Sequence, residues 1–389
     1  AVSAERHPSA GSRRCLRLEP GARLRRAAGG PGALFWMWLA AFFGMATKYA
    51  ECLLAVKYRV VDDNGEISGG PMYYIENGLG KRYHILAWLF ALFGVMCACL
   101  GTGSFAQVNS ITEITQITMG IDPWITGAVL TVVVAIVTIG GLQSIANVTS
   151  AVVPTMAVIY FVSTVGILIS YADKIPGAIG LVINSAFSTT AAQGGFLGAT
   201  VMLAMRSGVA RGVFSNESGL GSAPIVAAAA KTKWPAEQGL VSMTGTFIDT
   251  IIICTLTGLS LVVTGVWCGP ANGAAMTANA FTLGYGDIGK MILMVGLVLF
   301  AFTTILGWNY YGERCVEYLW GTPMIKPYRI IFIGIIACAP FLKLEEIWAL
   351  ADIVNGLMAF PNLVALVALS GVVVAETKAY MDYLKTKKE

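Results

Sequence analysis

The stretch at residues 208–225, GVARGVFSNESGLGSAPI, places polar side chains and glycines between two apolar runs. Gly219 and Gly221 tolerate backbone conformations that a helix does not contain, and Pro224 suits the first turn of a new helix. Unpaired backbone N–H and C=O groups are costly in hydrocarbon and persist only where they line protein or water. The pattern therefore predicts a helix that is broken inside the membrane; a capped kink in a packing helix is the structural alternative.

Backbone groups at such a break can bind a charged ligand directly. The second half of the helix would begin with free N–H groups and a partial positive charge, which suit a carboxylate. Ser215, Asn216 and Ser218 are placed to cap that half. These residues predict a site for a ligand that carries a carboxylate.

Two other polar side chains lie in apolar runs. Burying the Gln107 amide is costly unless it is bonded, so it contacts either a substrate or a neighbouring helix. Asp249, in GTFIDTIII, is a lone carboxylate in an apolar run, which predicts proton or cation coupling. Arg206 and Arg211 flank the predicted break, where one of them could pair with Asp249 or Glu217, in a structural or a transport role.

A third apolar run contains FAFTTILGWNYYGER. The hydroxyl oxygens of Thr303 and Thr304 are the kind of ligand that a hard cation such as sodium prefers. Threonines also commonly bond back to a carbonyl of their own helix, which is the structural alternative. Trp308, one turn later, either closes a small apolar pocket or packs between helices.

Three further patterns favour structural roles. Lys48 and Glu51 are three residues apart and predict an ion pair at a helix end. The small residues at 101–104, GTGS, favour close helix packing. Residues 65–83 contain turn glycines and aromatic residues, and no strand precedes them, so an ordered cytoplasmic connector is favoured over a phosphate-binding loop.

The composition indicates that these residues belong to an all-α polytopic membrane protein. The 389 residues are 56% hydrophobic and 12% charged, with a mean hydropathy of +0.70, far from the average soluble domain. A net charge of only +4, in short clusters, makes a nucleic-acid partner improbable. Only two histidines and no cysteine pair of the CxxC type are present, which leaves an enzyme or a metal centre little to work with. Six cysteines in or beside apolar runs are expected to be packing residues: Cys52, Cys97, Cys99, Cys254, Cys315 and Cys338.

About nine runs are long and apolar enough to cross a lipid bilayer. They cover residues 34–56, 85–117, 124–141, 145–171, 196–230, 240–266, 292–320, 328–342 and 347–375. If all nine cross in order, the basic loops fall on one side, and the positive-inside rule makes the C-terminus cytoplasmic. The chain then divides into an arginine-rich segment at 1–28, a transporter domain at 29–376 and a cytoplasmic tail at 377–389.

The same rule conflicts with the seven arginines in residues 1–28, which nine crossings would put on the outside. Either a tenth span is missing ahead of Leu34, or this segment is a tail whose charge does not set topology. Secondary transporters contain two repeats of opposite topology, each opening with a discontinuous helix. Four spans precede the broken one and four follow it, so a five-plus-five plan also needs one more discontinuous helix ahead of Leu34.

Five blocks in order resemble the sodium:alanine (alanine or glycine:cation) symporter family from about Gly29 to the C-terminus. They are GGPGALFWMWLAAFFGMATKYAECLLAVKYR, GGPMYYIENGLG, GTGSFAQVNS, GVARGVFSNESGLGSAPIVAAAAKT and GTFIDTIIICTLTGL. The family is similar to LeuT-type transporters, with two inverted five-helix repeats behind an extra helix. Residues 1–28 match neither that extra helix nor the first discontinuous helix, so the resemblance implies a truncated or mis-joined copy that is unable to transport.

The resemblance also implies roles for particular residues. Phe214, Ser215 and Asn216 would lie at the break and help to form the amino-acid site, with Gln107 as a polar contact and Trp308 in the apolar wall. By the LeuT-type plan, sodium would be bound by hydroxyl oxygens of the threonine pair at 303–304.

The implied function is sodium-coupled import of a small neutral amino acid, alanine or glycine, by alternating access across the cell membrane, with no cofactor. A proton-coupled transporter with Asp249 as the carrier is the first alternative. A membrane-embedded enzyme or receptor is the alternative of another class.

Overall fold

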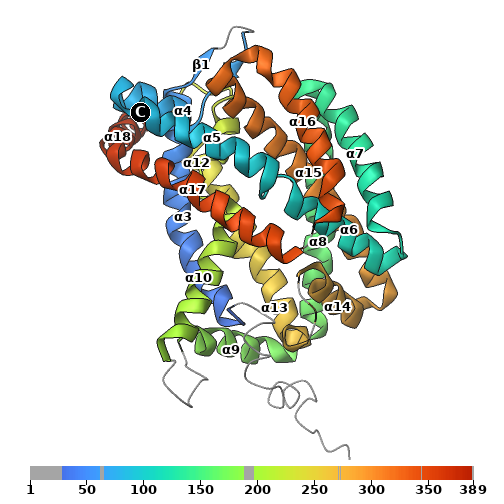
Figure 1. Cartoon of the computed structure of the whole chain (residues 1–389). Helices are drawn as coiled ribbons and strands as arrows, with labels where there is room; N and C mark the ends of the chain where they lie inside the picture. The colour runs from blue at the N-terminus through green and yellow to red at the C-terminus, as the bar shows by residue number, and fades with distance from the viewer. Residues whose placement is uncertain are drawn as a thin grey trace, which may run out of the picture.

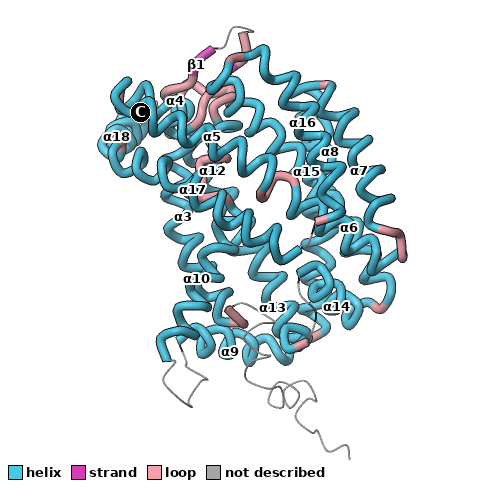
Figure 2. Tube along the Cα trace, in the orientation of Figure 1, coloured by secondary structure: helices cyan, strands magenta, loops and turns pink. Residues whose placement is uncertain are grey.

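The computed structural model describes residues 29–61, 65–187, 197–269, 271, 273–342 and 344–387. The predictions for residues 1–28 therefore lie outside the described residues. Helices dominate the described part of the chain (Figure 2), and its two short strands form one antiparallel pair in which Val60 faces Ser68. The expectation of an all-α polytopic membrane protein is confirmed.

The helices and strands follow one another closely. Those described are α3 (Gly32–Lys57), β1 (Val60–Val61), β2 (Ile67–Ser68), α4 (Pro71–Tyr74), η1 (Ile75–Leu79), η2 (Lys81–Tyr83), α5 (His84–Leu100), α6 (Phe105–Met119), α7 (Pro123–Ile139), α8 (Gly141–Ser170), η3 (Ala172–Lys174), α9 (Ile175–Phe187), α10 (Leu197–Asn216), α11 (Ala223–Ala227), α12 (Pro235–Thr246), η4 (Phe247–Cys254), α13 (Thr255–Thr264), η5 (Val266–Cys268), α14 (Gly273–Tyr285), α15 (Asp287–Trp320), η6 (Thr322–Met324), α16 (Ile325–Cys338), η7 (Ala339–Phe341), α17 (Leu344–Ala368) and α18 (Ser370–Thr386).

Seven helical stretches in the described part of the chain are long and apolar enough to cross a membrane. They are Gly32–Lys57, Lys81–Met119, Ser144–Ser170, Pro235–Thr264, Asp287–Trp320, Thr322–Phe341 and Trp348–Ala368. A shorter apolar helix, Pro123–Ile139, and the interrupted pair α10 and α11 account for the other two predicted runs. Each of the nine predicted runs therefore corresponds to helical structure.

Two predicted runs are interrupted where the hydropathy gave no signal. The run at 85–117 divides into α5 and α6 around residues 101–104, where a Cβ on Gly103 would lie 2.5 Å from Cβ of Trp308. This close approach supports the packing interpretation of GTGS. The run at 347–375 ends at Ala368, and α18 then packs on α3, where Tyr49 and Thr377 share a 2.7 Å hydrogen bond.

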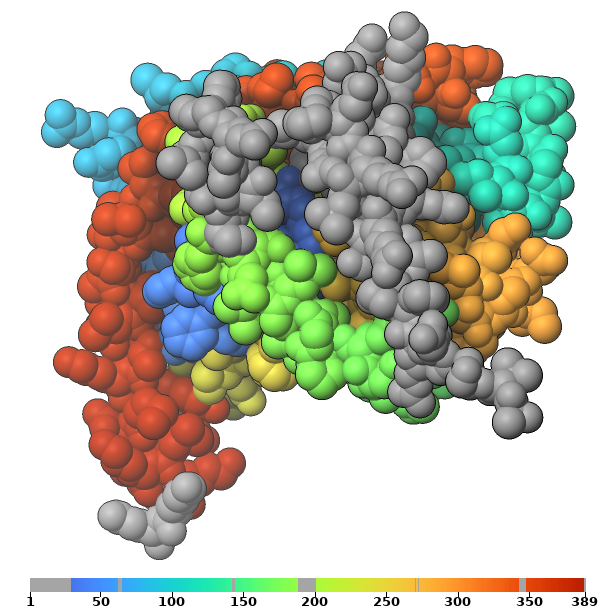
Figure 3. Space-filling model, turned by 90° about the horizontal axis from the view of Figure 1, so that it is seen from below, coloured from blue at the N-terminus to red at the C-terminus, as the bar shows by residue number. Residues whose placement is uncertain are grey.

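The centre of the molecule lies between two long helices, α3 and α15 (Figure 1). Helix α3 packs on α10, α11 and α12, whereas α15 packs on α5, α6, α8 and α14. Seen from below (Figure 3), α9 and α10 in green cross this face, with the red C-terminal helices on one side and the orange α14 on the other. The broken pair α10 and α11 therefore lies against α3, with one side of α10 at the surface and residues 218–222 buried.

Candidate functional site

The predicted break is present at residues 217–222. Helix α10 makes its last backbone bond from Glu217 N–H to Val213 C=O (2.8 Å), and α11 begins at Ala223. Between them, Glu217, Gly219 and Gly221 have φ values of 56°, 81° and 86°. A glutamate in the left-handed region costs about 1–2 kcal/mol, so the surrounding contacts must hold it there.

Side chains at the end of α10 bond to the π-helical segment η4. Ser215 Oγ donates to the Asp249 carboxylate, whose oxygens lie 3.0 and 2.8 Å away. Asn216 Nδ2 donates to Thr250 Oγ1 (2.9 Å), and that hydroxyl donates to Asp249 Oδ2 (2.9 Å). Turns of π-helix are frequent at functional sites. The structure thus brings Asp249 to Ser215 and Asn216, although Ser215 and Asp249 are 34 residues apart in sequence.

The capping prediction is wrong. Ser222 precedes α11 and makes no side-chain cap bond, and α11 has only five residues, so its partial charge is small. Ser215 bonds to Asp249, and Asn216 Oδ1 accepts from Ser218 N–H (2.9 Å). The Asn216 side chain therefore satisfies a backbone donor inside the break instead of capping the second half-helix.

Glu217 faces the α5–α6 interruption and α15. Its Oε2 accepts from Ser222 Oγ (2.7 Å), and its carboxyl group lies near Cys97 at the end of α5. The indole N–H of Trp308 lies near the Glu217 carboxyl group but forms no hydrogen bond with any described residue. Trp308 itself is fully buried and packs edge-on against Tyr311, with ring centroids 5.3 Å apart. The break, the second interruption and α15 therefore meet at one place.

The other predicted contact residues have different surroundings. Gln107 is buried in the first turn of α6 and forms no hydrogen bond with any described residue. Phe214 packs against Trp348 of α17, with ring centroids 4.9 Å apart. No hydrogen bond joins Gln107 to the break, and neither side chain lines the cavity described next.

A cavity of about 400 Å³ lies beside the break, between α3, α10 and α17. Apolar side chains form most of its wall, several of them exposed, so the cavity is open to the surface. Its polar side chains are those of Thr47, Asn216 and Ser218. Its volume is in the range of small-molecule sites. Of the predicted site residues, only Asn216 lines this cavity.

The threonines proposed as sodium ligands are bonded within their own helix. Oγ1 of Thr303 and of Thr304 donate to the Phe300 carbonyl, at 2.9 and 3.0 Å. A hydroxyl that donates in this way keeps oxygen lone pairs for a cation. Within the described residues, no group of three or more histidine, cysteine, aspartate or glutamate side chains could hold a metal ion.

The ion pair suggested for Arg211 is formed with a different partner. Its Nη2 lies 2.7 Å from Asp352 Oδ2 on α17, and its guanidinium covers the Trp348 ring at 4.7 Å. The interpretation that an arginine beside the break pairs with Glu217 or Asp249 is therefore wrong for Arg211. Partner choice here depends on how α10 packs against α17, which the sequence does not display.

Lys48 and Glu51 do not form the predicted ion pair at a helix end. Both are buried, and they are not within ion-pair distance of each other. Glu51 instead accepts from Asn362 Nδ2, and this amide also donates to the Gly219 carbonyl in the break (3.0 Å). Tyr74 donates to Asn362 Oδ1. Asn362, which carried no signal in the sequence, therefore joins α3, α4 and the break.

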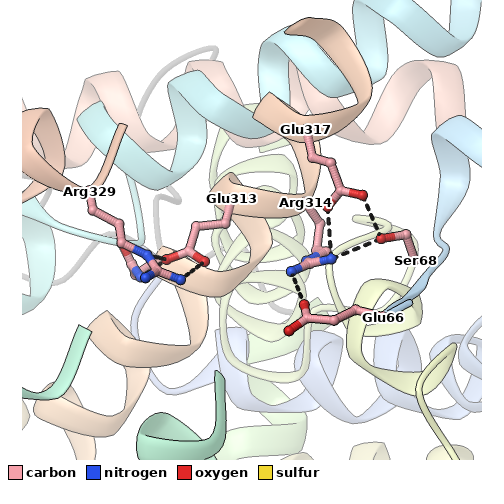
Figure 4. A network of polar contacts seen from close by, with 7 residues as sticks. Glu66, Ser68, Glu313, Arg314, Glu317 and Arg329 are labelled. Carbon is pink, nitrogen blue, oxygen red and sulfur yellow. Dashed lines mark hydrogen bonds and ion pairs between the residues drawn. The ribbon is translucent and has the colours of Figure 1, made fainter. Parts of the chain in front are cut away.

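A second buried charge network joins the β1–β2 hairpin to α15 (Figure 4). Arg314 lies between Glu66 (2.6 Å) and Glu317 (2.7 Å), and it also donates to Ser68 Oγ (2.9 Å). Next to it, Arg329 of α16 binds both oxygens of Glu313, each at 2.8 Å. A buried pair of this kind becomes strongly destabilising when one partner is removed.

A multi-pass helical bundle with a broken helix in its interior belongs to the class of secondary membrane transporters. The model of the family described as the sodium:alanine symporter family matches residues 24–389, and the chain therefore belongs to that family.

Three similar proteins have names that describe transporters. An uncharacterized transporter of Haemophilus influenzae is 58% identical over 360 residues, which is 92% of this chain and 78% of the relative. The sodium/alanine symporter AgcS of Methanococcus maripaludis is 50% identical over 92% of this chain and 79% of its own length. The probable sodium/glutamine symporter GlnT of Bacillus subtilis is 36% identical over 93% of this chain and 74% of its own length.

The protein is accordingly a sodium-coupled amino-acid symporter and a multi-pass membrane protein, with sodium as the co-transported ion. Family members are transporters, so the prediction that the chain is not an enzyme is confirmed.

Proposed function

We propose that this protein imports alanine or glycine together with sodium by alternating access, across the cell membrane. The break at 217–222 is the observation that carries the proposal, because its backbone groups can meet a carboxylate and an ammonium group directly. Phe214 and Trp308 would limit the substrate side chain to a methyl group or a hydrogen. The name of AgcS supports alanine at 50% identity, whereas that of GlnT, at 36%, indicates that substrates differ within the family.

The polar residues take complementary roles in this proposal. Gln107 contacts the substrate with an amide that has no hydrogen-bond partner among the described residues. Ser215 and Asn216 fix the shape of the break through their bonds to η4. Thr303 and Thr304 supply hydroxyl oxygens to sodium.

In this proposal, the hydrogen bonds of Asp249 hold the break, and binding of the co-transported ion affects how Asp249 holds it. Both of its carboxylate oxygens accept from hydroxyl groups, of Ser215 and Thr250. Hydrogen bonds that are donated to both oxygens favour the charged form of the carboxyl group. The bonding of Asp249 therefore favours sodium coupling over proton transfer by this residue.

We further propose a LeuT-type pair of inverted repeats with the C-terminus in the cytoplasm. Arg59 donates to the carbonyls of Ala228 (3.0 Å) and Ala230 (2.7 Å), and Lys57 pairs with Glu376, so these basic loops gather at one end of the bundle. The positive-inside rule makes that end cytoplasmic. Movement of one sodium ion into the cell then adds about 2.3 kcal/mol per 100 mV of membrane potential to the driving force for uptake.

The test is uptake of labelled alanine by liposomes that contain the purified protein. An inward sodium gradient should drive accumulation above the external concentration, and an interior-negative potential should increase it. Competition by unlabelled glycine and glutamine measures substrate choice. Uptake that is indifferent to sodium would refute the proposal.

A further inference from the structure

Glu51, two turns from the end of α3, is a carboxyl group with no exposed surface and one unpartnered oxygen. Its Oε1 accepts from Asn362, whereas Oε2 has no hydrogen-bond partner in the described part of the chain. The N–H groups of Gly219 and Gly221 in the break face this carboxyl group. An ionised carboxylate that is buried in this way carries a desolvation penalty of several kcal/mol.

Among the described residues, Lys48 is the one cation that acts on this carboxyl group. Lys48 lies close enough to Glu51, Glu217 and Asp249 to act on all three electrostatically, but it is in an ion pair with none of them. One ammonium group cannot neutralise three carboxylates. At least two of the three groups therefore need another source of stabilisation.

Two of the three carboxyl groups have such a source. Asp249 accepts hydroxyl bonds on both oxygens, and Glu217 is only half-buried and accepts from Ser222. Glu51 is fully buried and accepts one hydrogen bond, from Asn362; the N–H groups of Gly219 and Gly221 face it, but Oε2 has no hydrogen-bond partner among the described residues. An unpartnered neutral O–H group costs far less in such a place than an unpartnered charge. Glu51 is therefore the group for which a bound proton is most favourable.

We propose that Glu51 is a proton-binding site, that it is neutral in the arrangement described here, and that transport requires this neutral form. The proton binds to Oε2 from water when the break opens and returns to water when Glu51 becomes exposed again. This proposal rests on the symport function proposed above, and it adds a proton dependence to the sodium coupling. It also moves the proton site from Asp249, the candidate that the sequence suggested, to α3.

The groups around Glu51 are compatible with this role. The titratable side chains that face Glu51 are Lys48 and Cys52 on its own helix and Tyr74 on α4. Among the described residues of α17, Asn362 is the hydrogen-bond partner of Glu51, and an amide does not titrate. Burial raises the pKa of Tyr74 well above its ordinary value, so Tyr74 remains a hydrogen-bond donor. Because Tyr74 donates to Asn362 Oδ1, the amide N–H groups must point to Glu51 and to the Gly219 carbonyl.

The charge state of Glu51 can therefore influence how the break is held. A carboxylate would attract the N–H groups of Gly219, Gly221 and Asn362 more strongly than a neutral acid does. Ionisation would tighten the contact between α3 and the break and would slow its opening. The acid form should transport, and activity should fall as the pH rises.

The test compares alanine uptake by the wild-type protein and by Glu51→Gln at equal internal and external pH, with a fixed sodium gradient and a clamped potential. Glutamine keeps the acceptor for Asn362 but cannot ionise. The wild-type rate should fall by up to about tenfold per pH unit above the titration, whereas the variant should change by less than about twofold between about pH 6 and 9. Asp287→Asn is the control, because the Asp287 side chain is 96% exposed, and it should keep the wild-type profile.

The outcomes separate the two proposals. If the wild-type protein shows no sodium-driven uptake at any pH, the symport proposal fails. If it takes up alanine but shares its pH profile with Glu51→Gln, the proton site is refuted.

If Glu51→Gln folds but does not transport, infrared spectroscopy of the purified proteins gives the answer without transport. The carbonyl stretching band of a protonated carboxylic acid should be weaker in Glu51→Gln than in the wild type and in Asp287→Asn. An equal band in all three proteins would overturn the proposal.

Discussion

Replacing Ser215 with alanine removes the hydroxyl that donates to the Asp249 carboxylate. Only the Thr250 hydroxyl would then donate to this carboxylate, among the hydrogen bonds that the structure describes. A hydrogen bond to a charged group contributes about 1.5–3 kcal/mol, whereas neutral side-chain bonds in membrane proteins average about 0.6 kcal/mol. Because Asp249 is only half-buried, we expect Ser215→Ala to lower the free energy of unfolding by about 2 kcal/mol.

A double-mutant cycle with Asp249→Asn isolates the pair. Unfolding in detergent should give a coupling free energy of about 1.5–3 kcal/mol if a charged carboxylate accepts the bond. Ser170→Ala is the matched control, since the Ser170 hydroxyl bonds within its own helix to the Gly166 carbonyl (3.0 Å) at an exposed position, and should change stability by less than about 0.5 kcal/mol. A coupling free energy below about 0.5 kcal/mol would refute the reasoning, because Asp249 would then not hold the break.

Three other substitutions test separate parts of the structure. Gly221→Ala should lower the melting temperature, because φ is 86° at Gly221 and an added Cβ would lie 2.6 Å from an aromatic carbon of α5. Gly245→Ala is the control and should not lower it, because an added Cβ there has no neighbour within 4 Å. Equal changes in melting temperature would contradict the geometry of the break. Arg314→Met should cost about 3–5 kcal/mol of unfolding free energy, because it leaves the buried Glu317 carboxylate without its cation. Lys290→Met, at an exposed pair, should cost less than about 1 kcal/mol. Gln107→Ala should raise the alanine Kd about tenfold with little change in melting temperature, since no described hydrogen bond is lost; an unchanged Kd would remove it from the site.

Features that depend on local sequence were predictable. Hydropathy located the helices that are long enough to span a membrane, because a span is a property of about 20 consecutive residues, whereas α9 and α14 lie outside the nine predicted runs. Gly219, Gly221 and Pro224 located the break, because they alter the local backbone whatever packs against it. The polarity of Ser215 and Asn216 in an apolar run marked them as unusual before their partners were known.

Features that depend on how helices face one another were not predictable. Asp249 meets Ser215 across 34 residues, and the π-helical turns of η4 that carry Asp249 gave no signal in the sequence. Asn362 joins α3, α4 and the break, although the sequence shows only an amide in an apolar run. Glu51 was predicted to pair with Lys48 at a helix end, because its actual contacts come from α17 and from the break rather than from α3.

The most direct test of sodium coupling is the alanine Kd of the purified protein in sodium and in potassium solutions of equal ionic strength. Coupled binding must be reciprocal, so alanine should bind at least about tenfold more tightly in sodium, and sodium should bind more tightly in alanine by the same factor. Equal alanine affinity in both solutions would contradict a site in which sodium and the amino acid stabilise the same arrangement of the break.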